Sequence, residues 1–152
     1  MPAKTTRGPI RVGVLGQGRS GLDIHCAHLR TVPRKFRIVA VADLRRDRRE
    51  RAEAELRCAA YADYRELLAR DDIELVVNSL PSHLHPQVSV EALAAGHHVI
   101  CEKPLGWSVK EVDRVRRAAA RAGRVLLPFQ QSRNAPHFQQ ILQVIASGVL
   151  GR

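Results

Sequence analysis

A glycine-rich turn, Gly16-Gln17-Gly18-Arg19-Ser20-Gly21, is the first group of residues whose spacing suggests chemistry. It follows an apolar run at residues 10–15 and precedes a segment able to form a helix. In this G-x-G-x-x-G spacing the first glycine permits a tight turn, the second lets a diphosphate approach the backbone, and the third lets helix and strand pack closely. Free N–H groups and the positive end of the helix dipole attract phosphate. We therefore expect all six residues to bind the diphosphate of a dinucleotide.

An acidic residue, Asp43, stands at the end of the second apolar run, residues 36–42. A carboxylate at this place accepts hydrogen bonds from the adenosine ribose hydroxyls, so Asp43 favours NAD. Arg45 and Arg46 follow closely and could instead pair with the 2′-phosphate of NADP. The sequence thus predicts NAD and leaves NADP open, with Asp43 and Arg45 in the cofactor site. The alternative role for Asp43 is to cap a helix.

Histidine and cysteine do not form a metal-binding pattern. The three cysteines are far apart in the chain: Cys26, Cys58 and Cys101. Without a C-x-x-C spacing, neither a disulfide framework nor a zinc site is expected. His83 and His85 are two residues apart and would point in different directions on a helix. His25 and His28 could share a helix face, but no acidic residue beside them in the sequence suggests a ligand set. We expect no metal.

The elements that must position these residues alternate between strand and helix. Predicted strands cover residues 10–15, 36–42, 58–60, 74–79, 99–101 and 125–127. Predicted helices run from the glycine turn to about 29, then over about 47–56, from a cap at 63, and over 85–95, 109–122 and 136–147. Apolar strands separated by helices indicate an α/β fold, a doubly wound parallel sheet of six strands in Rossmann order 3-2-1-4-5-6. We expect a flexible tail at 1–9 and one Rossmann domain at 10–152.

Composition limits the classes of function. A chain of 152 residues with 45% hydrophobic content suits one globular domain. Because no apolar run is long enough for a bilayer and no secretory signal is evident, we expect a cytoplasmic protein and no membrane partner. The net charge of +10 invites a nucleic-acid function. The densest basic cluster, residues 45–51, contains acids and no aromatic residue for base stacking, so we expect no specific nucleic-acid binding.

Three further segments resemble one enzyme family. Residues 95–104, AGHHVICEKP, are similar to the A-G-K-H-V-x-x-E-K-P segment of the Gfo/Idh/MocA oxidoreductases. Residues 80–85, LPSHLH, resemble the T-P-x-x-x-H turn of that family, and residues 133–136, RNAP, resemble its R-F-x-P. The resemblance extends from residue 10 to residue 151. Together with the glycine turn, it identifies the chain as similar to the NAD(P)-dependent members of this family.

The resemblance implies hydride transfer between nicotinamide and a hydroxyl or carbonyl substrate, often a sugar or cyclitol. The lysine of E-K-P then lies beside nicotinamide and substrate, which makes Lys103 the expected catalytic residue. Its ammonium could stabilise developing negative charge or relay a proton. The resemblance also places Leu80, Pro81, His85 and Glu102 near the cofactor, and it implies a cis peptide bond before Pro104.

Members of this family continue beyond the segment at which this sequence stops. We therefore expect an absent C-terminal α/β domain, which would carry an Asp and His pair and most substrate contacts. The chain alone should bind cofactor but turn over a substrate poorly or not at all. The sequence leaves three roles open. It could be part of an oxidoreductase, a stand-alone nucleotide-binding or redox-sensing module, or a remnant without ligand. It also leaves open a homo-oligomer or a partner chain that supplies the missing domain.

Overall fold

Six parallel strands form the central sheet of the protein, whose computed structural model describes residues 8–151. The strands are β1 (Ile10–Leu15), β2 (Phe36–Ala42), β3 (Ala59–Tyr61), β4 (Leu75–Asn78), β5 (His98–Cys101) and β6 (Leu126–Pro128). Their order is β3-β2-β1-β4-β5-β6, which confirms the predicted fold and strand order. Most of the predicted tail lies outside the described residues. Gly8 and Pro9 are described and have no regular secondary structure.

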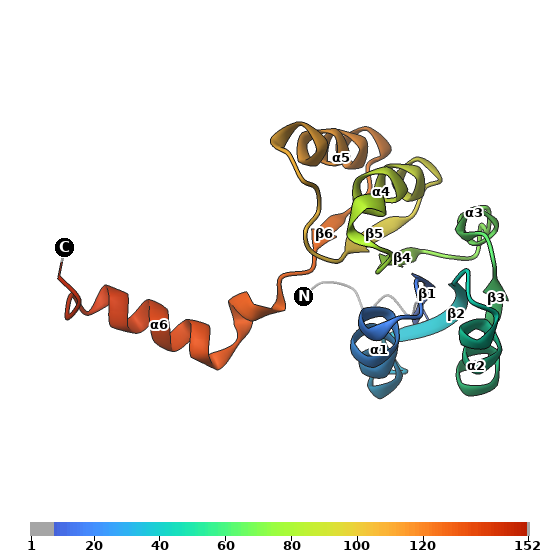
Figure 1. Ribbon diagram of the computed structural model, residues 1–152, viewed down its shortest axis with the longest axis horizontal. Helices are drawn as coiled ribbons and strands as arrows, with labels where there is room; N and C mark the ends of the chain where they lie inside the picture. Colours follow the sequence, from blue (N-terminus) through green and yellow to red (C-terminus); the bar gives the residue numbers. More distant parts are fainter. Residues whose placement is uncertain (1–7, 152) are drawn as a thin grey trace.

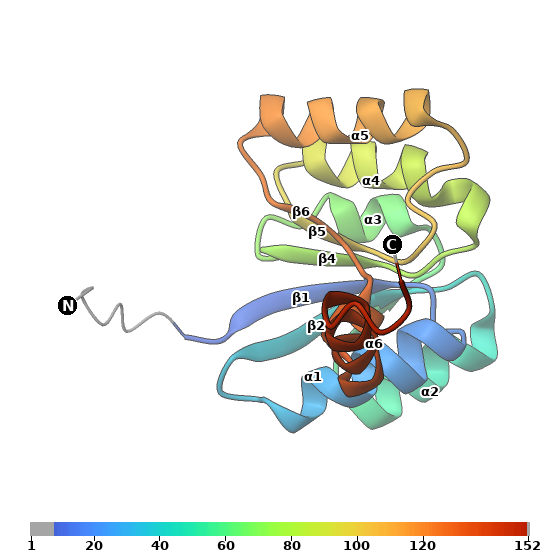
Figure 2. The same ribbon diagram turned by 90° about the vertical axis from the view of Figure 1, so that its left-hand side faces the viewer.

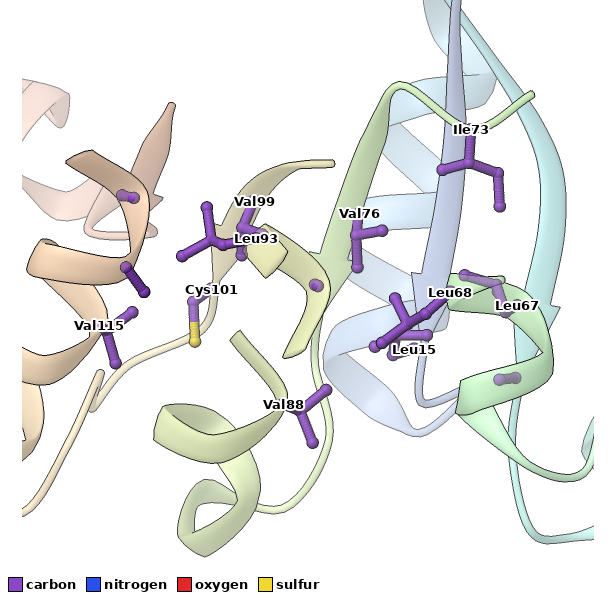
Figure 3. Packing of buried hydrophobic residues seen from close by; sticks show 14 of the residues in the cluster. Leu15, Leu67, Leu68, Ile73, Val76, Val88, Leu93, Val99, Cys101 and Val115 are labelled. Atoms are coloured by element: carbon purple, nitrogen blue, oxygen red, sulfur yellow. The ribbon is translucent and has the colours of Figure 1, made fainter. Parts of the chain in front are cut away.

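Helices cover both faces of the sheet (Figure 1). One face carries α1 (Ala27–Thr31) and α2 (Arg46–Leu56), and the opposite face carries α3 (Tyr64–Leu68), α4 (His85–Ala94) and α5 (Val109–Ala122) (Figure 2). Each face has its own buried apolar cluster. Figure 3 shows the larger cluster, in which Val76, Leu93 and Val99 pack between strands and helices. Strands buried on both faces explain why their sequences are continuous apolar runs.

Helix ends follow the capping signals of the sequence. The Asp63 carboxylate accepts a hydrogen bond from the backbone N–H of Arg65 at 2.9 Å, at the start of α3. The Ser108 hydroxyl accepts one from Glu111 at 3.2 Å, at the start of α5. Gly96 and Gly123 have φ angles of 91° and 61°, the left-handed conformation expected after α4 and α5. The predicted element boundaries agree with the structure to within one or two residues, apart from the first helix.

The first helix differs from the regular helix that was predicted. The segment Ser20–Cys26 is π-helical, and the chain becomes α-helical only at Ala27–Thr31, ending before Pro33. A π-helical turn accommodates more residues than an α-helical turn and often occurs at functional sites. In this segment Gly21, His25 and Cys26 are buried, so the third glycine and the histidine both face the interior of the protein.

The last helix, α6 (Pro136–Ala146), extends away from the sheet (Figure 1). It begins after a short 3-10 turn at Gln131–Asn134. Ile141, Leu142 and Ile145 on this helix are exposed, Ile145 by 59%. Among residues 8–151, every helix is too short or too polar to cross a bilayer.

Candidate dinucleotide-binding and catalytic site

The predicted site residues follow the carboxyl ends of neighbouring strands. The glycine turn follows β1, Asp43 follows β2, Leu80 follows β4 and Lys103 follows β5. Because all strands are parallel, these loops lie at one edge of the sheet. β1 lies between β2 and β4. The strands before β4 are added on one side of β1 and the strands from β4 onward on the other, so the strand order changes direction at this point. Open α/β sheets bind ligands at this switch point.

The three glycines of the turn have different surroundings. Gly16 has a φ of 86°, and a Cβ on it would lie 2.7 Å from the carbonyl oxygen of Ser79. A Cβ on Gly21 would lie only 1.8 Å from the carbonyl oxygen of Gly16. A Cβ on Gly18 would meet just one atom, Nη1 of Arg48, at 3.5 Å. Gly16 and Gly21 are therefore required by the fold, whereas the space over Gly18 is open to an approaching group.

Ser79 holds the turn from the neighbouring strand, and the sequence analysis missed it. Its hydroxyl lies 2.7 Å from the carbonyl oxygen of Leu15 and 3.1 Å from that of Gly16. Its backbone N–H donates to the Leu15 carbonyl at 2.9 Å. A small hydroxyl residue just after a buried strand is the signal that could have found it. The contact joins β4 to the start of the glycine turn.

The Asp43 carboxylate joins the glycine turn to the end of β2. Its side chain is 7% exposed. Oδ2 accepts a hydrogen bond from the backbone N–H of Gln17 at 2.7 Å, and Oδ1 accepts one from that of Arg45 at 2.9 Å. Nη1 of Arg48 lies 3.2 Å from Oδ2. The residue at the capping position of α2 is Arg45, so Asp43 supports the loop before the helix rather than the helix end itself.

Gln17 contributes its main chain to the site and its side chain to the core. The side chain is buried, with Nε2 3.3 Å from the Gly16 carbonyl oxygen and 3.7 Å from Sγ of Cys26. Nη2 of Arg51 donates to the Gln17 carbonyl at 3.1 Å. By contrast, Arg19 is exposed and Ser20 is half-buried at the start of the π-helical segment. Of the predicted diphosphate ligands, Gln17 thus has a buried side chain and a backbone N–H that already donates to Asp43.

Lys103 follows a buried acidic residue that is held by a histidine. Oε1 of Glu102 lies 3.0 Å from Nε2 of His25, and Oε2 lies 3.3 Å from the backbone N–H of Lys103. The His25 ring also lies 4.6 Å from the Phe129 ring, between centroids. Burial lowers the pKa of His25 below its ordinary value of 6.5, against the opposing effect of Glu102. The sequence neighbours of His25 gave no sign of this acidic partner, which lies 77 residues further along the chain.

The Lys103 side chain is exposed, and within residues 8–151 its ammonium has no ion-pair partner. The Lys103–Pro104 peptide bond is cis, as the resemblance implied. The side chain of Glu102 is buried beneath this turn, whereas the side chain of Lys103 points into solvent. The ammonium is free to meet a ligand at the carboxyl edge of the sheet.

His85 lies beneath the loops rather than at their surface. The residue is 1% exposed. Its Nε2 is 2.8 Å from the carbonyl oxygen of Leu80, and its Nδ1 is 2.8 Å from that of Pro104. The ring thus ties the Leu80-Pro81 turn to the turn that carries Lys103. Leu80 is half-buried and Pro81 is exposed, so Pro81 is the part of that turn open to a ligand.

Metal-ligating residues do not gather anywhere in residues 8–151, where no group of three His, Cys, Asp or Glu side chains could hold an ion. Cys26, Cys58 and Cys101 are all free thiols. Burial raises the pKa of each of them to about 11, which keeps them neutral near pH 7.

Residues 10–130 match the profile of the Gfo/Idh/MocA family, described as an oxidoreductase family with an NAD-binding Rossmann fold. The chain belongs to this family. The match covers the six strands and every loop at the carboxyl edge of the sheet described above. The fold, the strand order and the glycine turn of the chain all agree with the NAD-binding Rossmann domain of the Gfo/Idh/MocA family.

Curated relatives extend well beyond this Gfo/Idh/MocA domain. The uncharacterized oxidoreductase C115.03 of Schizosaccharomyces pombe is 35% identical over 146 residues, which are 95% of this chain and 40% of that protein. The dTDP-3,4-didehydro-2,6-dideoxy-alpha-D-glucose 3-reductase of Actinomadura kijaniata is 32% identical over 143 residues, or 94% of this chain and 43% of that protein. The chain thus spans about 40% of the length of these relatives.

Solved structures of similar proteins contain NADH in one case and NADP in another. The WlbA dehydrogenase from Bordetella pertussis, in complex with NADH and UDP-GlcNAcA, superposes with a TM-score of 0.87 at 28% identity, covering 97% of this chain and 42% of that one. KijD10, a 3-ketoreductase from Actinomadura kijaniata in complex with NADP and TDP-benzene, has a TM-score of 0.85 at 31% identity, covering 93% and 43%. The Gfo/Idh/MocA fold is therefore shared with NADH-bound and NADP-bound proteins.

Proposed function

We propose that this chain is the nicotinamide-dinucleotide-binding domain of a dehydrogenase or reductase, with NAD as cofactor and NADP accepted. The observation that carries the proposal is the space over Gly18. A Cβ there would approach a single guanidinium nitrogen, whereas a Cβ on Gly16 or Gly21 would overlap backbone. Since the fold does not use this space, it suits the approach of a diphosphate to the first helix.

The residues present fit the dinucleotide along its whole length. Backbone N–H groups of the turn from Gly18 to Gly21 would hold the diphosphate, with Arg19 adding positive charge and Ser20 a hydroxyl. The N–H groups of Gly16 and Gln17 already donate to Ala42 and Asp43. Asp43 would accept a hydrogen bond from the adenosine ribose. At the other end, Leu80 and Pro81 would flank the nicotinamide, and His85 would keep their turn in place through its contact with the Leu80 carbonyl.

Lys103 is the residue that we propose for catalysis. The bound nicotinamide supplies or accepts the hydride. The exposed Lys103 ammonium would donate a hydrogen bond to the reacting oxygen and stabilise its negative charge, or return a proton to it. Glu102 would act as a positioning residue, because its carboxylate accepts from the Lys103 backbone N–H while His25 holds its other oxygen.

The substrate that we propose is a sugar, a cyclitol or a sugar nucleotide. Similar proteins include a myo-inositol 2-dehydrogenase of Thermotoga maritima, 28% identical over 144 residues, and the sugar-nucleotide reductase of Actinomadura kijaniata. Because the chain spans about 40% of such proteins, most substrate contacts would come from additional polypeptide, in the same gene product or a partner. By itself the chain would bind cofactor and turn over substrate poorly.

Titration of the purified chain with NADH and with NADPH tests the cofactor. Saturable binding of either nucleotide by calorimetry supports the proposal. Gly18→Val should abolish binding, because its side chain fills the space over the turn, while far-UV circular dichroism shows a folded protein. If neither nucleotide binds to the folded wild-type chain, the proposed function is wrong.

A further inference from the structure

α5 carries a line of positive charge along its exposed side. This helix forms the outer edge of its layer, beside α4 (Figure 2). Basic residues follow one another along it at intervals of four, three and four positions: Lys110, Arg114, Arg117 and Arg121. Residues at this spacing lie on one side of a helix, and all of them are exposed. They form a basic stripe about 16 Å long, at a rise of about 1.5 Å per residue.

The acidic residues of α4 and α5 are all engaged away from the basic stripe. Glu111 accepts a hydrogen bond from the backbone N–H of Trp107 at 2.7 Å, and Asp113 lies 3.2 Å from Nε of Arg116. Glu91 of α4 accepts a hydrogen bond from the tyrosine hydroxyl of α3 at 2.8 Å. Within residues 8–151, no carboxylate forms an ion pair with any residue of the basic stripe. Its charge therefore remains available to an external anion.

An exposed aromatic ring lies at the start of the basic stripe. Trp107 is the one tryptophan of the chain and is 70% exposed. Because its backbone N–H donates to Glu111, the residue is held beside the first turn of α5. At the other end of the stripe a hollow of about 250 Å³ separates α4 from α5, and it is lined by Val90, Ala94, Ala118, Arg121 and Ala122. Cations in a line beside an exposed aromatic ring are features that bind unpaired nucleic-acid strands.

The residues of this surface favour a phosphate backbone over other anionic partners. A stable protein interface has an apolar centre with large side chains, whereas most side chains in the hollow beside the stripe are alanine. A helix that binds a membrane surface inserts its own apolar side, but that side of α5 is buried in the domain, at Val115 and Ala119. Guanidinium groups bind phosphate through paired N–H donors, and most cations of the stripe are arginines.

We propose that the basic stripe and Trp107 bind single-stranded nucleic acid without sequence preference. Backbone phosphates would lie along the cations of the stripe, and one base would stack on the Trp107 ring. The basic cluster at residues 45–51, which the sequence did not favour as a nucleic-acid site, differs because it contains arginine–carboxylate ion pairs. The surface on α5 includes neither the glycine turn nor Lys103, so it does not depend on the proposed function.

Fluorescence anisotropy with a labelled oligothymidylate of about twelve nucleotides tests the proposal. If the wild-type chain neutralises about four phosphates, its Kd should rise by about fiftyfold between about 50 and 200 mM salt, since log K falls by about 0.7 per phosphate for each tenfold rise in salt. Binding should also quench the emission of Trp107, because a base stacks on its ring. The absence of saturable binding at the lower salt concentration overturns the proposal.

Variants of the stripe and a matched control locate the binding surface. Arg114→Gln combined with Arg117→Gln should weaken binding by about tenfold or more at low salt and reduce the salt dependence by about half. Trp107→Ala should weaken binding by about fivefold or more, whereas Trp107→Phe should retain most of the affinity. Arg34→Gln combined with Lys35→Gln removes the same charge from exposed positions before β2 and should change the Kd by less than about twofold. An equal loss in this control overturns the proposal, because binding then follows net charge alone.

Two further measurements distinguish other partners and the proposed function. Vesicles containing phosphatidylserine, or poly-L-glutamate, should displace the oligonucleotide poorly at equal total charge; displacement as effective as that by unlabelled oligonucleotide overturns the proposal. The stripe variants should show wild-type far-UV circular dichroism and bind NADH as the wild-type chain does, and the single variant Arg117→Gln serves if the double variant does not fold. If the wild-type chain binds the oligonucleotide but no nicotinamide nucleotide, the proposed function alone is wrong.

Discussion

Nε2 of His25 lies 3.0 Å from Oε1 of Glu102, and both side chains are buried, at 7% and 9% exposure. The pair joins the helix that follows the glycine turn to the turn that carries Lys103. The carboxylate of Glu102 also accepts from the Lys103 backbone N–H. The two halves of the site, one for the diphosphate and one for the proposed chemistry, are therefore mechanically connected through this hydrogen bond.

Stability should depend on pH through His25. Burial lowers its pKa below 6.5, so in neutral solution the ring is uncharged in both the folded and the unfolded chain. As pH falls through 6.5, the unfolded chain binds a proton that the folded chain does not, and the free energy of unfolding decreases. One such group contributes a slope of at most about 1.4 kcal/mol per pH unit.

Urea denaturation of wild type and His25→Gln between pH 7.5 and 5.5 measures this slope. The glutamine variant should have a shallower pH dependence, whatever its stability at pH 7.5. Equal slopes in wild type and the His25 variant would show that this histidine is not the titrating group.

Substitutions at two glycines of the turn should affect folding and cofactor binding separately. Gly21→Ala places a Cβ within 1.8 Å of the Gly16 carbonyl oxygen, so the backbone must move. We expect a loss of about 3 kcal/mol or more, or no folded protein. Gly18→Ala meets only the end of the Arg48 side chain, so its thermal midpoint should stay near that of wild type while NADH binds more weakly. Circular dichroism melts with parallel NADH titrations distinguish the two effects.

Asp43→Ala should weaken both the loop and the binding of NADH. The substitution leaves the backbone N–H groups of Gln17 and Arg45 without their acceptor, which costs about 1–3 kcal/mol for a buried donor. NADH affinity should fall by about tenfold, since the ribose loses a charged acceptor. Asp47→Ala removes an exposed carboxylate from the nearby first turn of α2 and should change neither quantity beyond experimental error. Similar losses in both variants would contradict a specific role for Asp43.

The last helix should contribute little to the stability of the sheet. Ile141 and Ile145 on α6 are exposed by 51% and 59%. Replacing both by Glu should leave the free energy of unfolding within about 0.5 kcal/mol of wild type. Leu93→Ala, a fully buried position on α4, should instead cost about 2–5 kcal/mol. Both values come from the same chemical denaturation series. A large loss in the α6 variant would mean that this helix packs on the domain.

Much of the fold could be predicted because its signals are local. Apolar runs separated by helices determined the parallel sheet and its order, and the caps at Asp63 and Ser108 depend on residues two or three positions away. The spacing of Gly16 and Gly21 is likewise local. The carbonyl oxygen of Gly16 lies so close to the backbone of Gly21 that there is no room for a Cβ atom on the second residue. Such features follow from backbone geometry that a short segment imposes on itself.

The sequence by itself thus determined the fold, the family resemblance and the loops that carry the candidate site. Only the tertiary structure decided which side chains meet across those loops. It paired His25 with Glu102, 77 residues later, placed the guanidinium of Arg48 rather than that of Arg45 at Asp43, and set Ser79 against the glycine turn. The physical reason is that side-by-side strands bring their carboxyl ends together regardless of separation in the chain, so loops far apart in the sequence lie next to one another.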